Sequence, residues 1–148
     1  MDMKIDVNIK KLREDAILPS YGSEYAAGAD LYSCSDSVEI PSGETVLIHT
    51  GIAIELPRGL AGLIYARSGL ASKKGLAPAN KVGVVDCDYR GEILVALHNH
   101  SDEPRVVEKG ERIAQLVIAP YYTANFILTD ELSDTVRGEG GFGSTGTK

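Results

Sequence analysis

Residues 38–59 read VEIPSGETVLIHTGIAIELPRG and decide the fold class. This stretch holds three short apolar runs, at 38–40, 46–48 and 52–56. Proline, serine and glycine residues separate the runs, and Pro57-Arg58-Gly59 closes the stretch. Short aliphatic runs between glycine and proline turns are typical of strands rather than helices. The stretch therefore predicts several short strands in succession.

The same pattern continues on the C-terminal side of this stretch. Apolar runs at 93–97 and 113–118 each follow a turn that contains glycine. Many short strands at such spacing are typical of a β-sandwich or a β-barrel. We therefore predict an all-β fold.

Few segments have the composition of a helix. The segment 69–74 predicts one short helix, with Ser68 as its N-cap and Gly75 just beyond its end. A single helical turn is also expected within 130–136.

Length and charge limit the classes of protein to which the chain can belong. Its 148 residues are the length of one domain. The net charge of −6 is unlike that of proteins that grip nucleic-acid backbones, which concentrate lysine and arginine. Neither a membrane-spanning run nor a secretory signal is visible. We expect a cytoplasmic protein in which Cys34 and Cys87 are reduced, with no membrane or nucleic-acid partner.

Arg67, Ser68 and Gly69 form a candidate anion site. The free N–H groups at the start of a helix favour phosphate, and a glycine lets its backbone come close to a ligand. Serine caps are also common as purely structural features. Both interpretations stay open from these residues alone.

Carboxylates cluster directly after the apolar run 82–85. Asp86, Asp88 and Tyr89 precede a glycine turn, which predicts a hairpin with carboxylates near its tip. A carboxylate at a strand end can act as a general base or anchor a cation, although aspartate is also an ordinary turn residue. Asp30 lies in another turn of small residues. Together with the candidate anion site, these groups suggest metal-assisted phosphate chemistry.

Two histidines and the glycine-rich tail allow more than one interpretation. His98 and His100 would share a strand face, as metal ligands can, but no third ligand is near in sequence, and a surface role is favoured. The last twelve residues, from Arg137, contain five glycines and cannot build a core. Their composition predicts disorder. The arginine, the phenylalanine and the hydroxyl groups of the tail could also fold over an anion and an aromatic ring.

Five motifs occur in order along the chain. They read AGADLYS at 27–33, ARSGLA at 66–71, GVVDCDYRG at 83–91, GERIAQL at 110–116 and RGEGGFGSTG at 137–146. With these motifs the sequence resembles the trimeric deoxyuridine triphosphatases (dUTP diphosphatases, or dUTPases). The resemblance covers residues 27–146. The one departure is Ala66, where many members carry proline.

The resemblance implies both a fold and a reaction. The fold is a single-domain, jelly-roll-like β-barrel or sandwich, with a core at 1–136 and a flexible C-terminal lid at 137–148. The reaction is the Mg²⁺-dependent hydrolysis of dUTP to dUMP and pyrophosphate, which keeps uracil out of DNA and supplies dUMP for thymidylate synthesis. Asp86 is the implied catalytic base that activates water. Asp30 is implied to act on Mg²⁺ indirectly, through water.

The resemblance also implies the substrate contacts. Arg67, Ser68, Gly69 and Gln115 are implied to hold phosphate oxygens. Tyr89 is implied to pack under the deoxyribose and to leave no space for a 2′-hydroxyl. The residues implied to form the uracil pocket in the third-motif hairpin are Asn80, Gly83, Val84, Val85 and Leu94.

The tail and the assembly follow from the same resemblance. Phe142 is implied to cover the uracil and Gly143 to join the substrate contacts, while Arg137 and Ser144 are implied to contact the γ-phosphate. The tail is then a lid that orders when substrate is bound. The implied assembly is a homotrimer whose active sites are shared between subunits.

Three other functions are weighed against this one. A dCTP deaminase shares the fold but requires a different pocket carboxylate. A non-catalytic nucleotide-binding protein on the same scaffold would be expected to lack Asp86 or the tail residues. A plain β-sandwich interaction module would leave the five motifs unexplained.

Overall fold

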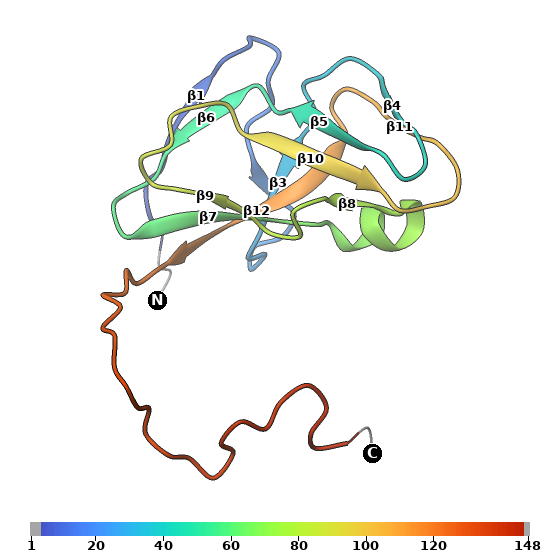
Figure 1. Ribbon diagram of the computed structural model, residues 1–148. Coiled ribbons are helices and arrows are strands. Elements are labelled where there is room, and N and C mark those ends of the chain that lie inside the picture. The colour runs from blue at the N-terminus through green and yellow to red at the C-terminus, as the bar shows by residue number, and fades with distance from the viewer. Residues whose placement is uncertain (1–3, 147–148) are drawn as a thin grey trace.

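The computed structural model describes residues 4–146, and these form a body of short strands with a long C-terminal tail (Figure 1). The elements are β1 (Asn8–Lys11), β2 (Ser20–Tyr21), β3 (Ala29–Tyr32), β4 (Val38–Ile40), β5 (Thr45–His49), β6 (Ile52–Glu55), β7 (Leu60–Tyr65), the short helix η1 (Leu70–Lys74), β8 (Leu76–Pro78), β9 (Gly83–Val85), β10 (Leu94–Asn99), β11 (Arg105–Val107) and β12 (Arg112–Pro120). The prediction of an all-β fold is confirmed.

The stretch 38–59 forms β4, β5 and β6, as its pattern predicts. Gly43, Gly51 and Gly59 have φ angles of 77°, 70° and 88°. These left-handed conformations are costly for other residues, so glycine is what lets the chain turn between strands here.

Four antiparallel sheets enclose one core. The largest has the strand order β2-β3-β12-β7-β9, the second has the order β5-β10-β8, and two-stranded sheets pair β1 with β6 and β4 with β11. In Figure 1, β5 and β10 lie opposite β12 and β7. The core between these layers includes Leu31, Ile48, Ile64, Val95, Leu97, Ile113 and Leu116. The sheets of the described residues stay separate, so the fold is jelly-roll-like and is not a closed barrel.

The short helix differs from its prediction at its N-terminal end. Gly69 precedes it in a helical conformation, and no side chain caps the helix, so the prediction of Ser68 as N-cap is wrong. The Ser68 carbonyl instead accepts a hydrogen bond from the Ser72 hydroxyl at 2.6 Å. Gly75 ends the helix in the left-handed conformation, as predicted.

The predicted hairpin of the third motif is also wrong. β9 pairs with β7 in the five-stranded sheet, whereas β10 pairs with β5 and β8 in the opposite layer. Residues 86–93 therefore cross from one sheet to the other. Alternating apolar residues mark where strands lie, but their partners are chosen by tertiary packing.

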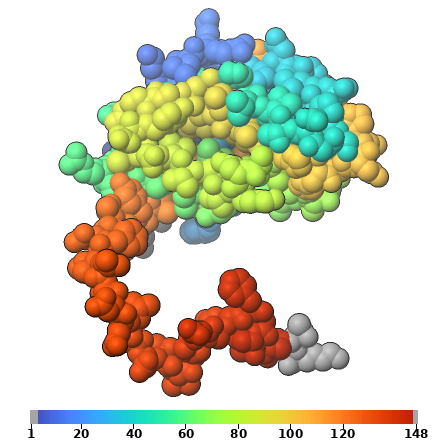
Figure 2. All heavy atoms as spheres, viewed as in Figure 1, coloured from blue at the N-terminus to red at the C-terminus, as the bar shows by residue number. Residues whose placement is uncertain are grey.

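The segment after β12 leaves the body (Figure 2). Residues 121–139 are all exposed, and the helical turn predicted within 130–136 does not form. A short helix needs a surface to pack against, and none is offered by the described part of the same chain. The predicted lid at 137–148 includes residues 147 and 148, which lie outside the described residues.

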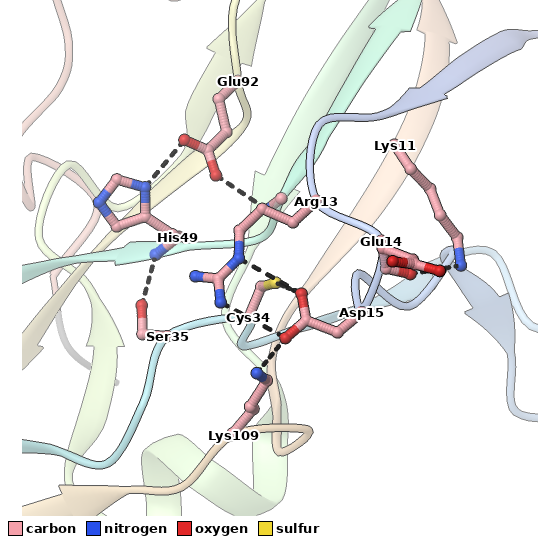
Figure 3. A network of polar contacts seen from close by, with 10 residues as sticks. Lys11, Arg13, Glu14, Asp15, Cys34, Ser35, His49, Glu92 and Lys109 are labelled. Atoms are coloured by element: carbon pink, nitrogen blue, oxygen red, sulfur yellow. Dashed lines mark hydrogen bonds and ion pairs between the residues drawn. The ribbon is translucent and has the colours of Figure 1, made fainter.

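The N-terminal segment is tied to the body by a polar cluster (Figure 3). Asp15 accepts hydrogen bonds from Lys109 and from the buried thiol of Cys34 and pairs with Arg13. The Lys109 hydrogen bond is the main cause that lowers the pKa of Asp15 to about 2. Asp15 is therefore ionised at neutral pH. Cys34 and Cys87 are both free.

Within residues 4–146, no helix has the length and apolar character needed to span a membrane.

Candidate active site

Three of the five motifs meet on the five-stranded sheet. Asp30 on β3 is the register partner of Gln115 on β12, and Gln115 is the partner of Tyr65 at the end of β7. The chain continues from Tyr65 through Ala66 to Arg67. Because neighbouring strands lie about 5 Å apart, the first, second and fourth motifs converge here. We call Asp30, Arg67 and Gln115 the sheet cluster.

Asp30 is the charged centre of the sheet cluster. Its residue is only 8% exposed, and its Oδ1 accepts a hydrogen bond from Arg67 Nε at 2.8 Å. Arg112 Nη1 lies 3.6 Å from the other carboxylate oxygen, Oδ2. A buried carboxylate requires such compensation. Asp30 therefore holds the Arg67 guanidinium by a hydrogen bond and pairs with Arg112, and this group of three side chains carries a net positive charge.

Arg112 was not singled out from the sequence, although it lies inside the fourth motif. It is the register partner of Tyr32, which follows Asp30 by two positions on β3. Residues two apart on a strand share a face. Arg112 is therefore recognised as a site residue only from the pairing of β12 with β3. The residues next to it in the sequence give no such indication.

Gln115 fixes the backbone that leads to Arg67. Its Nε2 donates a hydrogen bond to the Ala66 carbonyl at 2.8 Å. A Cβ atom at Gly28 would overlap Gln115 Oε1 and would lie 3.0 Å from both Cβ and Cδ of Gln115. Gly28 thus leaves the space that Gln115 occupies. The departure at Ala66 keeps the carbonyl that this hydrogen bond requires.

The backbone beyond Arg67 is open to a ligand. Ser68 and Gly69 are both exposed. No atom lies within 4 Å of a Cβ built on Gly69. An anion can therefore approach the Gly69 backbone next to the Arg67 side chain.

The third motif begins on β9, where Gly83 and Val85 are buried and Val84 is exposed. Gly83, Val84 and Val85 make up β9, and a Cβ at Gly83 would lie 3.4 Å from Asn80 Nδ2. Asp86 and Tyr89 of this motif are exposed, and so is Leu94 at the start of β10. The Tyr89 N–H donates to the Asp86 carbonyl at 3.1 Å, which closes the turn between them.

A single chain does not bring Asp86 to the sheet cluster. Val85 pairs with Gly62, three residues before Tyr65 on β7, and β9 is three strands away from β3. With spacings of 3.3 Å along strands and 4.8 Å between them, the Cα atoms of Asp30 and Asp86 are roughly 15–20 Å apart. Their side chains cannot meet around one phosphorus atom in the same chain.

The fifth motif is also remote from the sheet cluster. The Arg137 side chain donates from Nε to the Gly140 carbonyl at 2.7 Å, and the Ser144 N–H donates to the Gly141 carbonyl at 3.1 Å. The Phe142 ring is fully exposed. In the described part of the tail from Ala124 onward, each hydrogen bond joins two tail residues.

The acidic and histidine side chains of the described residues form no group of three that could hold a metal ion. His98 and His100 lie with their ring centroids 6.2 Å apart. A hollow of about 420 Å³ lies on the outer side of the third motif and is lined by residues that include Asn8, Glu55, Arg58, Asp88 and Arg90. This hollow does not include any residue of the sheet cluster.

The family model for dUTPase matches residues 14–146. The chain belongs to the dUTPase family. A deoxyuridine 5′-triphosphate nucleotidohydrolase of Hydrogenobaculum sp. is 54% identical over 140 residues, which cover 95% of this chain and 97% of the relative. The resemblance inferred from the five motifs is confirmed.

Solved structures of dUTPases have the same fold. The dUTPase of Staphylococcus bacteriophage 80alpha with dUPNHPP is 30% identical, with a TM-score of 0.90 over 97% of this chain and 100% of that one. A mutant dUTPase from phage phi11 of S. aureus has a TM-score of 0.80 at 24% identity, covering 88% of this chain and 100% of that one. Its structure is described as showing the coordination of a structural Mg(II) ion.

Proposed function

We propose that this member of the dUTPase family hydrolyses dUTP to dUMP and pyrophosphate. The observation that carries the proposal is the full-length similarity to deoxyuridine 5′-triphosphate nucleotidohydrolases, at 54% identity over 95% of the chain. In the cell this reaction keeps uracil out of DNA and provides dUMP for thymidylate synthesis. A cytoplasmic location stays a prediction.

The sheet cluster is the proposed phosphate site. Arg67 supplies positive charge, and the exposed Ser68 hydroxyl and Gly69 N–H supply hydrogen-bond donors. Gln115 Nε2 has a second hydrogen beyond the one given to Ala66, which can reach a phosphate oxygen. Asp30 orients Arg67 so that its guanidinium keeps one position. A fixed cation stabilises developing phosphate charge better than a mobile one.

The donor set near Asp30 fits a magnesium ion that arrives with the triphosphate. Both Asp30 oxygens face guanidinium groups, and the described residues contain no cage of carboxylates. Mg²⁺ commonly keeps several waters and binds substrate phosphates with few protein ligands. Asp30 would hold the ion through one of these waters. The bound ion would neutralise charge on the phosphate oxygens.

Asp86 is the proposed catalytic base. It follows strand β9 directly, and its carboxylate is exposed, so it can accept a proton from water. A base positioned within hydrogen-bond reach of water contributes about 10²–10⁴ in rate. Asp86 would orient the water for in-line attack on the α-phosphorus, with pyrophosphate as the leaving group.

The third motif is the proposed uracil and sugar site. The backbone of β9 and the Asn80 amide would bond the uracil edge, with Leu94 beside the pocket. Cytosine exchanges an acceptor for a donor at its 4-position, and such a mismatch leaves polar groups unpaired. The Tyr89 ring would lie under the deoxyribose and leave no room for a 2′-hydroxyl.

The separation of the motifs within one chain supports a shared site. The sheet cluster of one subunit would face Asp86 of a second, and a tail would close over both. Phe142 would cover the uracil, with Gly143 beside it, while Arg137 and Ser144 would bind the γ-phosphate. From Ala124 to Gly146 the tail extends from the body and makes no hydrogen bond to it, as a segment that docks on a neighbour would. The proposed assembly is a homotrimer.

A substrate panel tests the proposed function. The purified protein is incubated with dUTP, dCTP, dTTP or UTP in the presence of Mg²⁺, and pyrophosphate and ammonia are measured. We expect pyrophosphate from dUTP alone at substantial rates, and loss of that activity when a chelator removes the metal. Release of ammonia from dCTP would instead identify a deaminase. Binding of dUTP without turnover would identify a non-catalytic protein.

A further inference from the structure

The Tyr89 ring is held in place although it is not buried. The residue is 44% exposed, so packing alone does not fix its side chain. Its hydroxyl donates a hydrogen bond to the Glu92 carbonyl at 2.8 Å. Arg90 and Gly91 lie between these two residues in the sequence, and the ring is folded back over Gly91.

Gly91 is the surface against which the Tyr89 ring lies. A Cβ atom built on Gly91 would lie 2.6 Å from Tyr89 Cζ and 3.0 Å from Cε2. Gly91 does not have a positive φ angle, so its backbone conformation is open to other residues. A side chain at this position would therefore displace the Tyr89 ring from where it now lies.

Arg90 ties down the backbone of the turn around Tyr89. Its Nη1 donates to the Cys87 carbonyl at 2.7 Å and to the Tyr89 carbonyl at 3.2 Å. Its Nη2 donates to Glu55 Oε1 on β6 at 3.1 Å. A planar guanidinium can serve three acceptors in this way, whereas a lysine ammonium cannot reproduce the same fork.

Glu92 connects the turn that carries Tyr89 to His49 on β5 and to Gly51 just after β5 (Figure 3). Its Oε1 accepts a hydrogen bond from the Gly51 N–H at 2.9 Å, and its Oε2 lies 2.8 Å from His49 Nδ1. These contacts anchor the residue whose carbonyl binds Tyr89. His49, Gly51 and Glu55 all lie outside the five motifs.

We propose that Gly91, Arg90 and Glu92 are positioning residues for the choice between deoxyribose and ribose. They hold the Tyr89 ring where it excludes a 2′-hydroxyl. The inference rests on the sugar-contacting role of Tyr89 given under the proposed function. Excluding one hydroxyl demands placement to within about 0.5 Å, and an exposed ring on a turn reaches this only if its support is rigid.

The test measures the ratio of kcat/KM for dUTP to kcat/KM for UTP. Tyr89→Ala, Gly91→Ala and the double variant are compared with the unaltered chain. We expect Tyr89→Ala and Gly91→Ala each to lower the ratio by about tenfold, in part through faster UTP turnover. The double variant should fall no further than Tyr89→Ala alone, because Gly91 acts through the ring.

Three outcomes would overturn the inference, and they are distinguishable. An unchanged ratio in Tyr89→Ala would show that Tyr89 does not select the sugar, and the inference would then be wrong. The substrate panel could still show dUTP hydrolysis in that case. A changed ratio in Tyr89→Ala with an unchanged ratio in Gly91→Ala would remove the positioning role alone. Additive losses in the double variant would show that Gly91 acts on something other than the ring.

A second variant covers the case in which Gly91→Ala does not fold. Arg90→Lys keeps the positive charge but loses the fork that holds the turn, so we expect the ratio to fall several-fold. The double variant with Tyr89→Ala should fall no further than Tyr89→Ala alone. Arg58→Lys is the matched control. Arg58 is an exposed arginine that, like Arg90, lines the hollow of about 420 Å³. This control variant should leave the ratio unchanged. Equal effects of the two lysine variants would contradict the proposal.

Discussion

Replacing Asp86 with asparagine should lower kcat by about 10²–10⁴-fold, the range of a general base. Asparagine keeps the size of the side chain but loses the oxygen that takes a proton from water. The affinity for a non-hydrolysable dUTP analogue should change little, because Asp86 is proposed to act on water and not to hold the nucleotide. Steady-state kinetics and calorimetric titration measure the two quantities separately.

The control for this prediction is Asp88→Asn. Asp88 is exposed in the same turn, two positions beyond Asp86, so its substitution makes the same chemical change nearby. We expect it to retain most of the activity. An Asp86→Asn enzyme that kept most of its kcat would show that another group activates water.

A chain that stops at Val136 should lose most of its activity and little of its stability. The deleted residues include Arg137, Phe142 and Ser144, which are proposed to close over the substrate, and loss of a closing lid removes phosphate contacts and admits water. The described tail makes no hydrogen bond to the body from Ala124 onward. The melting temperature and the assembled mass should therefore stay close to those of the full chain. Full activity in the truncated chain would contradict the proposed role of the tail as a lid over the substrate.

The sequence predicts the strands well because their signals are local. The residues 38–59 form three strands and their turns, since glycine conformations and short aliphatic runs act over only a few residues. The five motifs also identify the family correctly. Each of these inferences depends on residues that are close in sequence.

Two features that the sequence did not predict depend on partners that are distant along the chain. The third motif reads as a hairpin, yet β9 and β10 join different sheets, because pairing is decided by packing across the core. The prediction of Ser68 as a cap is wrong for a local reason, because Gly69 stands at the N-cap position in a helical conformation and no side chain caps η1. The ion pair between Arg112 and Asp30 becomes visible only when β3 and β12 are aligned.

One chain brings together only part of the proposed site. The pairing of β3, β12 and β7 brings the sheet cluster together. The distances between Asp30, Arg67 and Gln115 along the sequence do not predict this, because the three residues come from separate strands or strand ends. The chain leaves Asp86 and the tail elsewhere. We therefore propose that neighbouring subunits complete each site.

Subunit mixing tests this claim most directly. Chains that stop at Val136 are mixed with full-length Asp86→Asn chains, each nearly inactive alone, and exchange is verified by mass. Truncated Asp86→Asn chains replace the truncated ones in the control mixture. If base and tail come from different subunits, random equal mixing restores about a quarter of the sites in a symmetric trimer. The account predicts that recovery, with none in the control, whereas complete exchange without recovered activity would contradict the shared site.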